Sequence, residues 1–247
     1  MSLQTIVGPP NSGRAGEILR LLRARLDDGP FLVVPTGDDI ARFERDLCAG
    51  GSPALGATIR TFASLVDDVA AATGVAHPPP LTSAQRLALM RAATAETPLR
   101  TLARSARSAG FAAALDVLVA ELQAALVSPA DLRAAVEGLD DAGHELEIAA
   151  LYEAYELLRD GAGRGDAGSV ANAAIAAMHA DPDGWGERPV LVYGFDDLTE
   201  AQLELLRLLA RRCDVTLAVS YADRNALAAR AGLVARLEQE LDAERSA

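Results

Sequence analysis

Short strand-like runs of apolar and β-branched residues alternate with amphipathic segments at both ends of the chain. The runs lie at residues 3–7, 31–35, 57–60, 189–195 and 214–220. Continuous apolar runs of this length are typical of parallel strands that are buried on both faces. Their alternation with helical patterns predicts an α/β fold, in which a parallel sheet is flanked by helices.

The middle of the chain has a different pattern. Three prolines at 78–80 interrupt the alternation, because proline continues neither a helix nor a central strand. From Thr82 to about residue 180 the pattern is nearly all helical. The simplest organisation is an α/β domain formed by residues 1–76 and 185–247, with a helical subdomain of residues 77–184 inserted between its halves.

The first strand, loop and helix have the form of a phosphate-binding loop. Gly8 and Gly13 stand at the G-x-x-x-x-G spacing, with Asn11 and Ser12 between them. In such a loop, backbone N–H groups and a helix N-terminus converge on phosphate. The spacing therefore predicts a nucleotide loop at residues 8–15.

The reactive positions of that loop are changed. A Lys that reaches the phosphates and a Ser or Thr that holds Mg²⁺ are replaced by Arg14 and Ala15. All 23 basic residues are Arg, which we interpret as the bias of a GC-rich genome and which partly discounts the exchange of Lys. Alanine cannot ligate a metal, so we expect no cofactor, and ATP with Mg²⁺ only if the degenerate loop still binds them.

Composition limits the function classes. Of the 247 residues half are hydrophobic, and the formal net charge is −12. Such a chain is a poor general binder of nucleic acid, so any DNA contact has to be local.

Cys48 and Cys213 are too few for a disulfide framework or a zinc site, and we expect both to be buried or inert. No apolar run is long enough for a membrane span and no targeting pattern opens the chain, so we expect a cytoplasmic protein.

Three segments, in order along the chain, resemble UvrD-like superfamily 1 helicases. Residues 8–15 look like their Walker A element, and residues 190–206 look like the strand and helix of their Walker B region. Thr61-Phe62-Ala63-Ser64-Leu65 is similar to a T-F-x-S-L element that lies near the single-stranded DNA path in that family. The resemblance implies a RecA-like P-loop domain with a helical insertion like subdomain 1B, and makes Thr61, Phe62 and Ser64 candidates for the DNA path.

Within that superfamily the chain resembles the AddB/RexB family, the helicase-like nuclease subunits of bacterial double-strand-break repair complexes. Further signatures are Gly194-Phe195 in place of Asp-Glu, the helical tyrosine segment from Leu151 to Glu156, and Ser-Pro-x-Asp-Leu at 128–132. The resemblance implies a role in homologous recombination. It also implies an AddA-like helicase–nuclease partner and contact with single-stranded or double-stranded DNA.

Departures from an active motor determine the expected activity. Tyr193 and Gly194 stand at Walker B-like positions, where a working ATPase has an Asp near Mg²⁺ and a Glu that orients water. Asp196 and Asp197 follow, and we interpret them as a helix-entry cluster that complements the macrodipole instead of a metal pair. We therefore expect no catalytic residue in this chain, although the full-length family is a helicase and exodeoxyribonuclease. This interpretation requires residues 8–15 to join a central strand to a helix that lies beside the strand ending at Tyr193.

Some residues have two interpretations. Phe62 fits either a ring stacked on a DNA base or a core aromatic, and Tyr152 and Tyr155 fit core packing better than stacking. Six arginines form a locally basic stretch that fits a phosphate backbone, although a solvated helix face is the default. They are Arg60, Arg86, Arg91, Arg100, Arg104 and Arg107.

The leading hypothesis is a noncatalytic helicase-like region that scaffolds an AddB-like subunit and guides single-stranded DNA. One alternative is a divergent active NTPase, in which Arg14 replaces Lys and Asp196 or Asp197 holds the metal. Another is a helical protein-interaction module without DNA contact, which the net charge of −12 permits.

Overall fold

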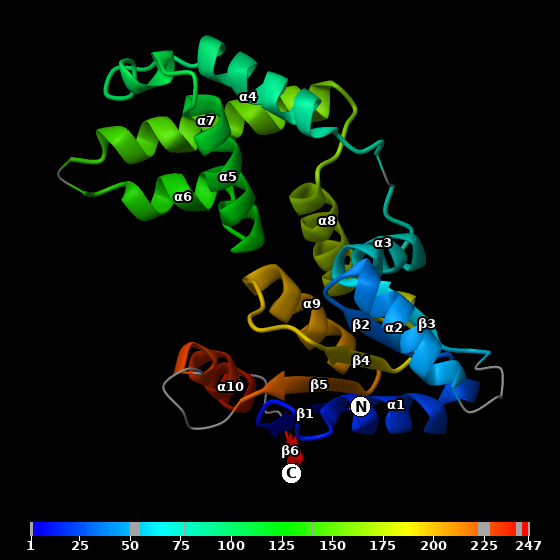
Figure 1. Ribbon diagram of the computed structural model, residues 1–247. Helices are drawn as coiled ribbons and strands as arrows, with labels where there is room; N and C mark the ends of the chain where they lie inside the picture. The colour runs from blue at the N-terminus through cyan, green and yellow to red at the C-terminus, as the bar shows by residue number, and fades with distance from the viewer. Residues whose placement is uncertain are drawn as a thin grey trace. The chain divides into compact units, whose positions relative to one another are not determined.

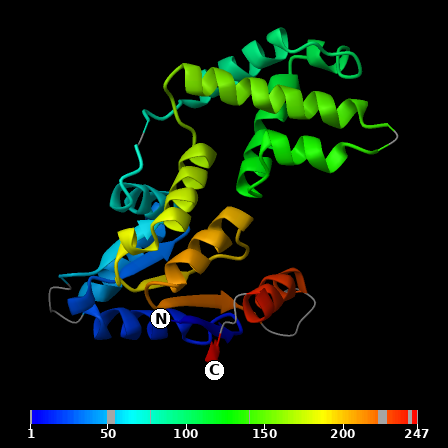
Figure 2. The same ribbon diagram turned by 180° about the vertical axis from the view of Figure 1, so that it is seen from behind.

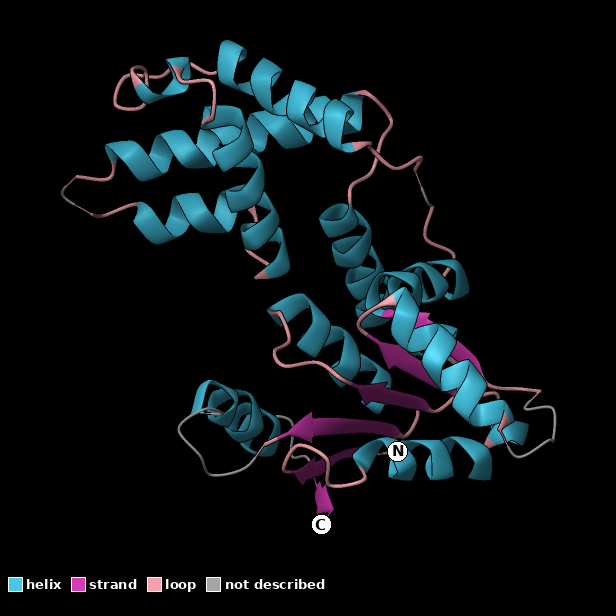
Figure 3. Cartoon of the chain, viewed as in Figure 1, coloured by secondary structure: helices cyan, strands magenta, loops and turns pink. Residues whose placement is uncertain are grey.

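The computed structural model describes residues 2–49, 55–76, 78–139, 141–221, 228–240 and 244–246. The chain divides into two compact units, one formed by residues 1–75 and 174–247 and the other by residues 76–173. All the described strands lie in the first unit, and the second unit is helical (Figure 3).

The first unit is built on a parallel sheet. Its strands have the order β3-β2-β4-β5-β1, and the short β6 adds to the outer side of β1 (Figure 1). Their bounds are β1 Leu3–Gly8, β2 Phe31–Val34, β3 Thr58–Thr61, β4 Val190–Tyr193, β5 Val215–Ser220 and β6 Glu244–Ser246. The five predicted strands and the parallel α/β class are confirmed, whereas the sequence pattern missed β6.

The strand with the glycine loop is not beside the strand ending at Tyr193. β1 pairs with β5 over its whole length, with Gly8 opposite Ser220, and β5 then pairs with β4, with Ala218 opposite Tyr193. The neighbour of the loop strand is therefore β5 and not β4, whereas α1 (Arg14–Ala24), the helix that follows the loop, packs against β4 through the cluster that contains Leu191, as the sequence analysis requires. Since all these strands are parallel, the ends of β1, β4 and β5 still meet at one carboxyl edge.

Helices cover both faces of the sheet. Helices α1 (Arg14–Ala24) and α2 (Gly37–Cys48) pack on one face, in a cluster with Leu32, Leu191 and Ala218. α9 (Glu200–Ala210) connects β4 to β5 in the opposite direction along the sheet, so a right-handed crossover places it on the other face. Both views show α1 and α9 on opposite sides of β5 (Figure 1, Figure 2). The remaining helices of this unit are α3 (Phe62–Ala72), α10 (Ala228–Glu240) and the short 3-10 turns η1 (Leu26–Asp28) and η3 (Pro182–Trp185).

The two cysteines differ in exposure. Cys213 is buried, but Cys48 is exposed, so of the expected alternatives, buried or inert, burial does not hold for Cys48. Leu47 faces the core cluster, and the next residue of a helix points about 100° away from it.

The helical unit contains α4 (Ser83–Glu96), α5 (Phe111–Ala124), α6 (Pro129–Val136) and α7 (Gly143–Gly161), while α8 (Ala167–Ala180) continues into the first unit. Thr82 and Ser128 begin α4 and α6 with reciprocal capping boxes, as their sequences predict. The core contains Met90 and Leu115 with Tyr152 and Tyr155, which confirms both tyrosines as core residues.

One stretch of the helical unit differs from its prediction. Residues 97–110 contain only the 3-10 turn η2 (Ser105–Arg107), because Pro98 disfavours helix at Thr97 and Gly110 delays the next start. Among the described residues no single helix is long and apolar enough to span a membrane. α5 and α6 together reach the length and composition, but they are bent by 92° at their break.

Candidate functional site

The predicted nucleotide loop lies at the carboxyl edge of the sheet, between β1 and α1. Gly13 precedes the first residue of α1 with a left-handed φ of 82°, a conformation that favours glycine. Gly8 leaves room for the Ser12 side chain, because a Cβ there would lie 2.6 Å from Ser12 Oγ and 3.3 Å from its Cβ. Asn11 also has a positive φ, of 64°, and the Ser12 amide donates to the Pro9 carbonyl at 3.2 Å. Both glycines of the motif therefore have a structural reason.

Arg14 does not point its charge into a phosphate position in front of the loop. Its Nη1 donates to the carbonyl oxygen of Gly8 and, at 2.6 Å, to that of Val219. The Tyr221 amide donates to the same Gly8 carbonyl at 2.9 Å. The guanidinium therefore ties the end of β1 to the end of β5, a role that the sequence did not indicate.

Ala15 is part of the core. Its half-buried methyl group packs against the cluster that α1 and α2 form with the sheet. With no side-chain oxygen at Ala15 and the Arg14 guanidinium bonded to carbonyls, these two positions do not fit Mg²⁺ and a nucleoside triphosphate in the way that Lys and Ser or Thr do.

The Walker B-like positions contribute packing to the same edge. The half-buried ring of Tyr193, the last residue of β4, meets Phe43 of α2 edge-on, with 5.2 Å between ring centroids. Gly194 has a φ of 90°, and a Cβ there would lie 3.1 Å from Cδ of Pro35. The left-handed conformation thus favours glycine, and any side chain there, a carboxylate included, would also be crowded by Pro35.

Asp196 and Asp197 lie on the exposed turn before α9. One carboxylate oxygen of Asp197 accepts the Leu198 amide at 2.9 Å. The helix cap itself is Thr199, which forms a reciprocal capping box with Gln202. Asp197 thus stabilises the turn that leads into α9, while Thr199 caps the helix. Across the described residues, no group of three His, Cys, Asp or Glu side chains is arranged to hold a metal.

The T-F-x-S-L segment runs from the end of β3 into α3. Thr61 caps α3 by accepting the Ser64 amide, and the two hydroxyl groups are 3.2 Å apart. Phe62 is 7% exposed, and its ring packs edge-on against Phe195 with centroids 6.0 Å apart. The burial favours the core interpretation of Phe62 over base stacking.

The Phe62–Phe195 contact joins two predicted elements that are 133 residues apart in the sequence. The Gly-Phe turn after β4 therefore touches the T-F-x-S-L segment after β3, and the glycine loop follows β1 at the same carboxyl edge of the sheet, with β5 between β1 and β4. Of the residues that form this edge, the sequence analysis missed the roles of Phe195 and Pro35. The Gly-Phe pair at 194–195 was the only sequence signal for Phe195, and the sequence contained no signal for Pro35.

Comparison with known proteins gives one family. A family model described as ADDB, N-terminal, matches residues 5–232 of the chain. No curated protein matches the chain.

Proposed function

The chain belongs to the AddB N-terminal family, which forms part of an AddAB helicase–nuclease involved in DNA break repair, and from that premise we propose that it is a noncatalytic helicase-like region. In this proposal residues 1–76 and 185–247 form a RecA-like P-loop domain, and residues 77–184 form a 1B-like insertion. The region scaffolds an AddA-like partner in the cytoplasm and guides single-stranded DNA.

The Arg14 guanidinium is the single observation that carries the noncatalytic assignment. It donates to the carbonyl groups of Gly8 and Val219, within the sheet edge, instead of reaching toward a bound phosphate. The residues at the other reactive positions support the same assignment. Ala15, Tyr193 and Gly194 are packed, and none has a side chain suited to hold Mg²⁺ or to orient the attacking water. The loop has kept its backbone architecture while its side chains serve the core.

A phosphate-release assay with ATP and Mg²⁺ tests this assignment. We expect no turnover above the buffer, and any affinity for ATP to be the same with and without Mg²⁺. The matched variants are Gly13→Ala and Gly16→Ala. The first forces alanine into a left-handed conformation, whereas an added Cβ at Gly16 meets nothing within 4 Å. Mg²⁺-dependent turnover that Gly13→Ala abolishes and Gly16→Ala retains would show a divergent active NTPase instead.

The DNA-guiding part of the proposal is supported by the family and by position. Thr61 and Ser64 lie at the carboxyl edge, where open parallel sheets bind their ligands. Phe62 is packed against Phe195 and contributes to this edge as a core residue.

A further inference from the structure

Most of the described arginines in this acidic chain have hydrogen-bond or ion-pair partners within the protein. Arg60 pairs with Asp68 at 2.9 Å, and Arg86 pairs with Asp166 at 2.9 Å, so two members of the basic stretch are structural. In the part of the chain that the structure describes, six arginines have side chains without a hydrogen-bond or ion-pair partner. They are Arg91, Arg100, Arg104, Arg107, Arg164 and Arg211.

Four of these six lie close together in sequence within the helical unit. Arg91 is on α4, and Arg100, Arg104 and Arg107 belong to the segment between α4 and α5, with Arg107 in the 3-10 turn η2. All four are exposed. We call these four residues the arginine surface. Residues 91–110 contain these four arginines and one acid, Glu96, which gives a local charge of 4 − 1 = +3 in a chain whose net charge is −12.

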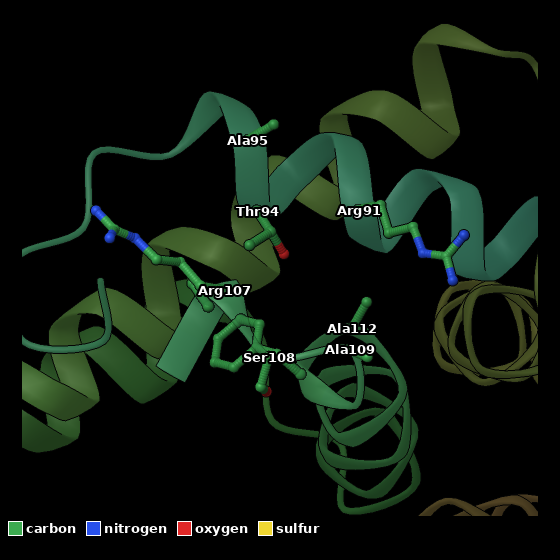
Figure 4. A pocket seen from close by; sticks show the side chains of 9 residues that line it. Arg91, Thr94, Ala95, Arg107, Ser108, Ala109 and Ala112 are labelled. Carbon is green, nitrogen blue, oxygen red and sulfur yellow. The ribbon is translucent and has the colours of Figure 1, made fainter. Parts of the chain in front are cut away.

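Two members of the arginine surface border one hollow of about 440 Å³. Figure 4 shows Arg91 and Arg107 on opposite sides of it, with Thr94 and Ser108 between them. The other lining residues are four alanines and Phe111, so no carboxylate lines the hollow. Its volume is in the range of sites that hold a nucleotide-sized group.

The backbone around the hollow is also suited to an anion. Ala109, Phe111 and Ala112 line it at the start of α5. The N-cap residue Gly110 has no side chain to cap the first amides, of which that of Phe111 donates to the Ser108 carbonyl at 3.2 Å. The first turn of α5 contains no acidic residue. The partial positive charge of this helix end adds to that of the guanidinium groups.

The segment that carries three of the arginines is held in place. The Glu147 carboxylate of α7 accepts the amides of Arg100, Thr101 and Leu102 at 2.7, 2.8 and 2.8 Å. Glu147 therefore uses its charge on backbone N–H groups and not on a guanidinium. The arginine side chains are exposed on an ordered backbone, which lowers the entropic cost of binding a ligand.

We propose that the arginine surface binds the phosphate backbone of single-stranded DNA. The inference rests on the DNA-guiding role proposed above and assigns it to residues of the helical unit. Guanidinium groups bind phosphate through paired N–H donors, and a run of phosphates matches several separate arginines better than a single small anion does. Ser108 adds a hydroxyl group of the kind that contacts phosphate and sugar, whereas the Thr94 hydroxyl donates to the Met90 carbonyl at 2.7 Å.

A variant with all four arginines changed to Gln tests the proposal: R91Q/R100Q/R104Q/R107Q. The matched control is R20Q/R42Q/R164Q/R211Q, which gives the same net charge of −16 from −12 but leaves the arginine surface intact. The readout is fluorescence anisotropy of a labelled oligo-dT over salt concentrations of about 50–200 mM. Circular dichroism tests that both variants fold. We expect that they do, because the four surface arginines are exposed and the control loses only the exposed ion pairs of Arg20 with Glu17 and of Arg42 with Asp46.

For the wild-type chain we expect binding that weakens steeply with salt. Each lost phosphate contact lowers the slope of log K against log salt by about 0.7, so the surface variant should lose up to about 3 from the slope and about tenfold or more in affinity at low salt. The control should bind as the wild type does, apart from a small uniform loss. Equal losses in both variants, no loss in the surface variant, or no oligo-dT binding by the wild type would overturn the proposal.

Poly-L-glutamate of similar length distinguishes DNA from an acidic protein partner. We expect it to compete weakly at equal charge concentration. Competition as strong as that of unlabelled oligo-dT would show that the arginine surface takes an acidic polypeptide. These outcomes are independent of the ATP assay: a noncatalytic loop with unaffected DNA binding in the surface variant removes this inference and leaves the noncatalytic assignment standing.

Discussion

Asp166 is the buried carboxylate on which the polar core of the helical unit depends. One of its oxygens accepts the Tyr155 hydroxyl at 2.6 Å and lies 2.9 Å from Arg86 and 3.5 Å from Arg159. Its other oxygen accepts the Ser169 amide at 2.8 Å. Burial by itself raises the pKa of Asp166, but these hydrogen bonds and the two guanidinium groups outweigh it and lower the pKa below the ordinary 3.8.

Replacing Asp166 with Asn should destabilise the chain by about 3 kcal/mol, because two guanidinium groups lose a shared buried anion. Each keeps another carboxylate, so the loss is at the lower end for broken buried pairs. The folded-state pKa is depressed, so this stabilisation is complete above about pH 4 and is lost as the pH falls through the folded-state pKa. Urea titrations at pH 7 and pH 3 measure it, with exposed Asp141→Asn as the control. A difference that grows toward pH 3 would contradict this account.

The two thiols should react at very different rates. Burial, and then the charge of Asp214, raise the pKa of Cys213 to about 12, whereas Cys48 is exposed. Because the thiolate is the nucleophile, iodoacetamide at pH 8 should modify one thiol in the native chain and two after unfolding. Mass spectrometry of the wild type and of Cys48→Ser measures this. Fast modification of native Cys48→Ser would show that Cys213 is accessible.

Among the elements, the segment between α4 and α5 shows how an irregular stretch becomes ordered. The three amides that Glu147 accepts replace the helical hydrogen bonds that residues 100–102 lack. These hydrogen bonds lower the pKa of the Glu147 carboxyl, and the bond from the Leu102 amide has the largest effect. The Glu147 carboxylate on α7 therefore fixes the conformation of residues 100–102, which the sequence of the loop does not specify by itself.

Changing Glu147 to Gln should release this segment, because an amide oxygen accepts neutral hydrogen bonds that are weaker than those of a carboxylate. Hydrogen exchange should become faster at residues 100–102, with the β-strand amides unchanged. Glu121→Gln is the control, since Glu121 is an exposed residue of α5 without a partner among the described side chains. Equal exchange in E147Q and the wild type would show that the packing of Leu102 suffices.

At the scale of the whole molecule, the two units have separate cores. Leu191 of β4 lies in the cluster under α1 and α2, and Leu151 of α7 lies in the cluster of the helical unit. Changing either leucine to Ala should cost about 2–5 kcal/mol, because each leaves a cavity in a close-packed core.

Hydrogen exchange should show each loss within its own unit. Leu191→Ala should raise exchange in β1, β2, β4 and β5, and Leu151→Ala should raise it in α4, α5 and α7. The two variants serve as each other's control. Faster exchange throughout the chain in both would show a single cooperative unit.

The strands and most caps were predictable because their signals are local. The continuous apolar run at 31–34 is buried at all four positions, and Thr82-Ser-Ala-Gln85 forms the capping box that its spacing indicates. β6 and the break at 97–110 were missed. The pattern around residue 245 contains no apolar alternation, and the order of 97–110 depends on Glu147, about 45 residues away.

The sequence by itself determined the α/β class, the five core strands and the strand–loop–helix form at residues 3–24, because periodicity and glycine spacing depend on near neighbours alone. Only the tertiary structure decided that β5 separates the loop strand from β4, that Arg14 bonds the carbonyl groups of Gly8 and Val219, and that Phe62 packs on Phe195. Each of these is a contact between residues distant in sequence, and such contacts depend on how the whole chain packs.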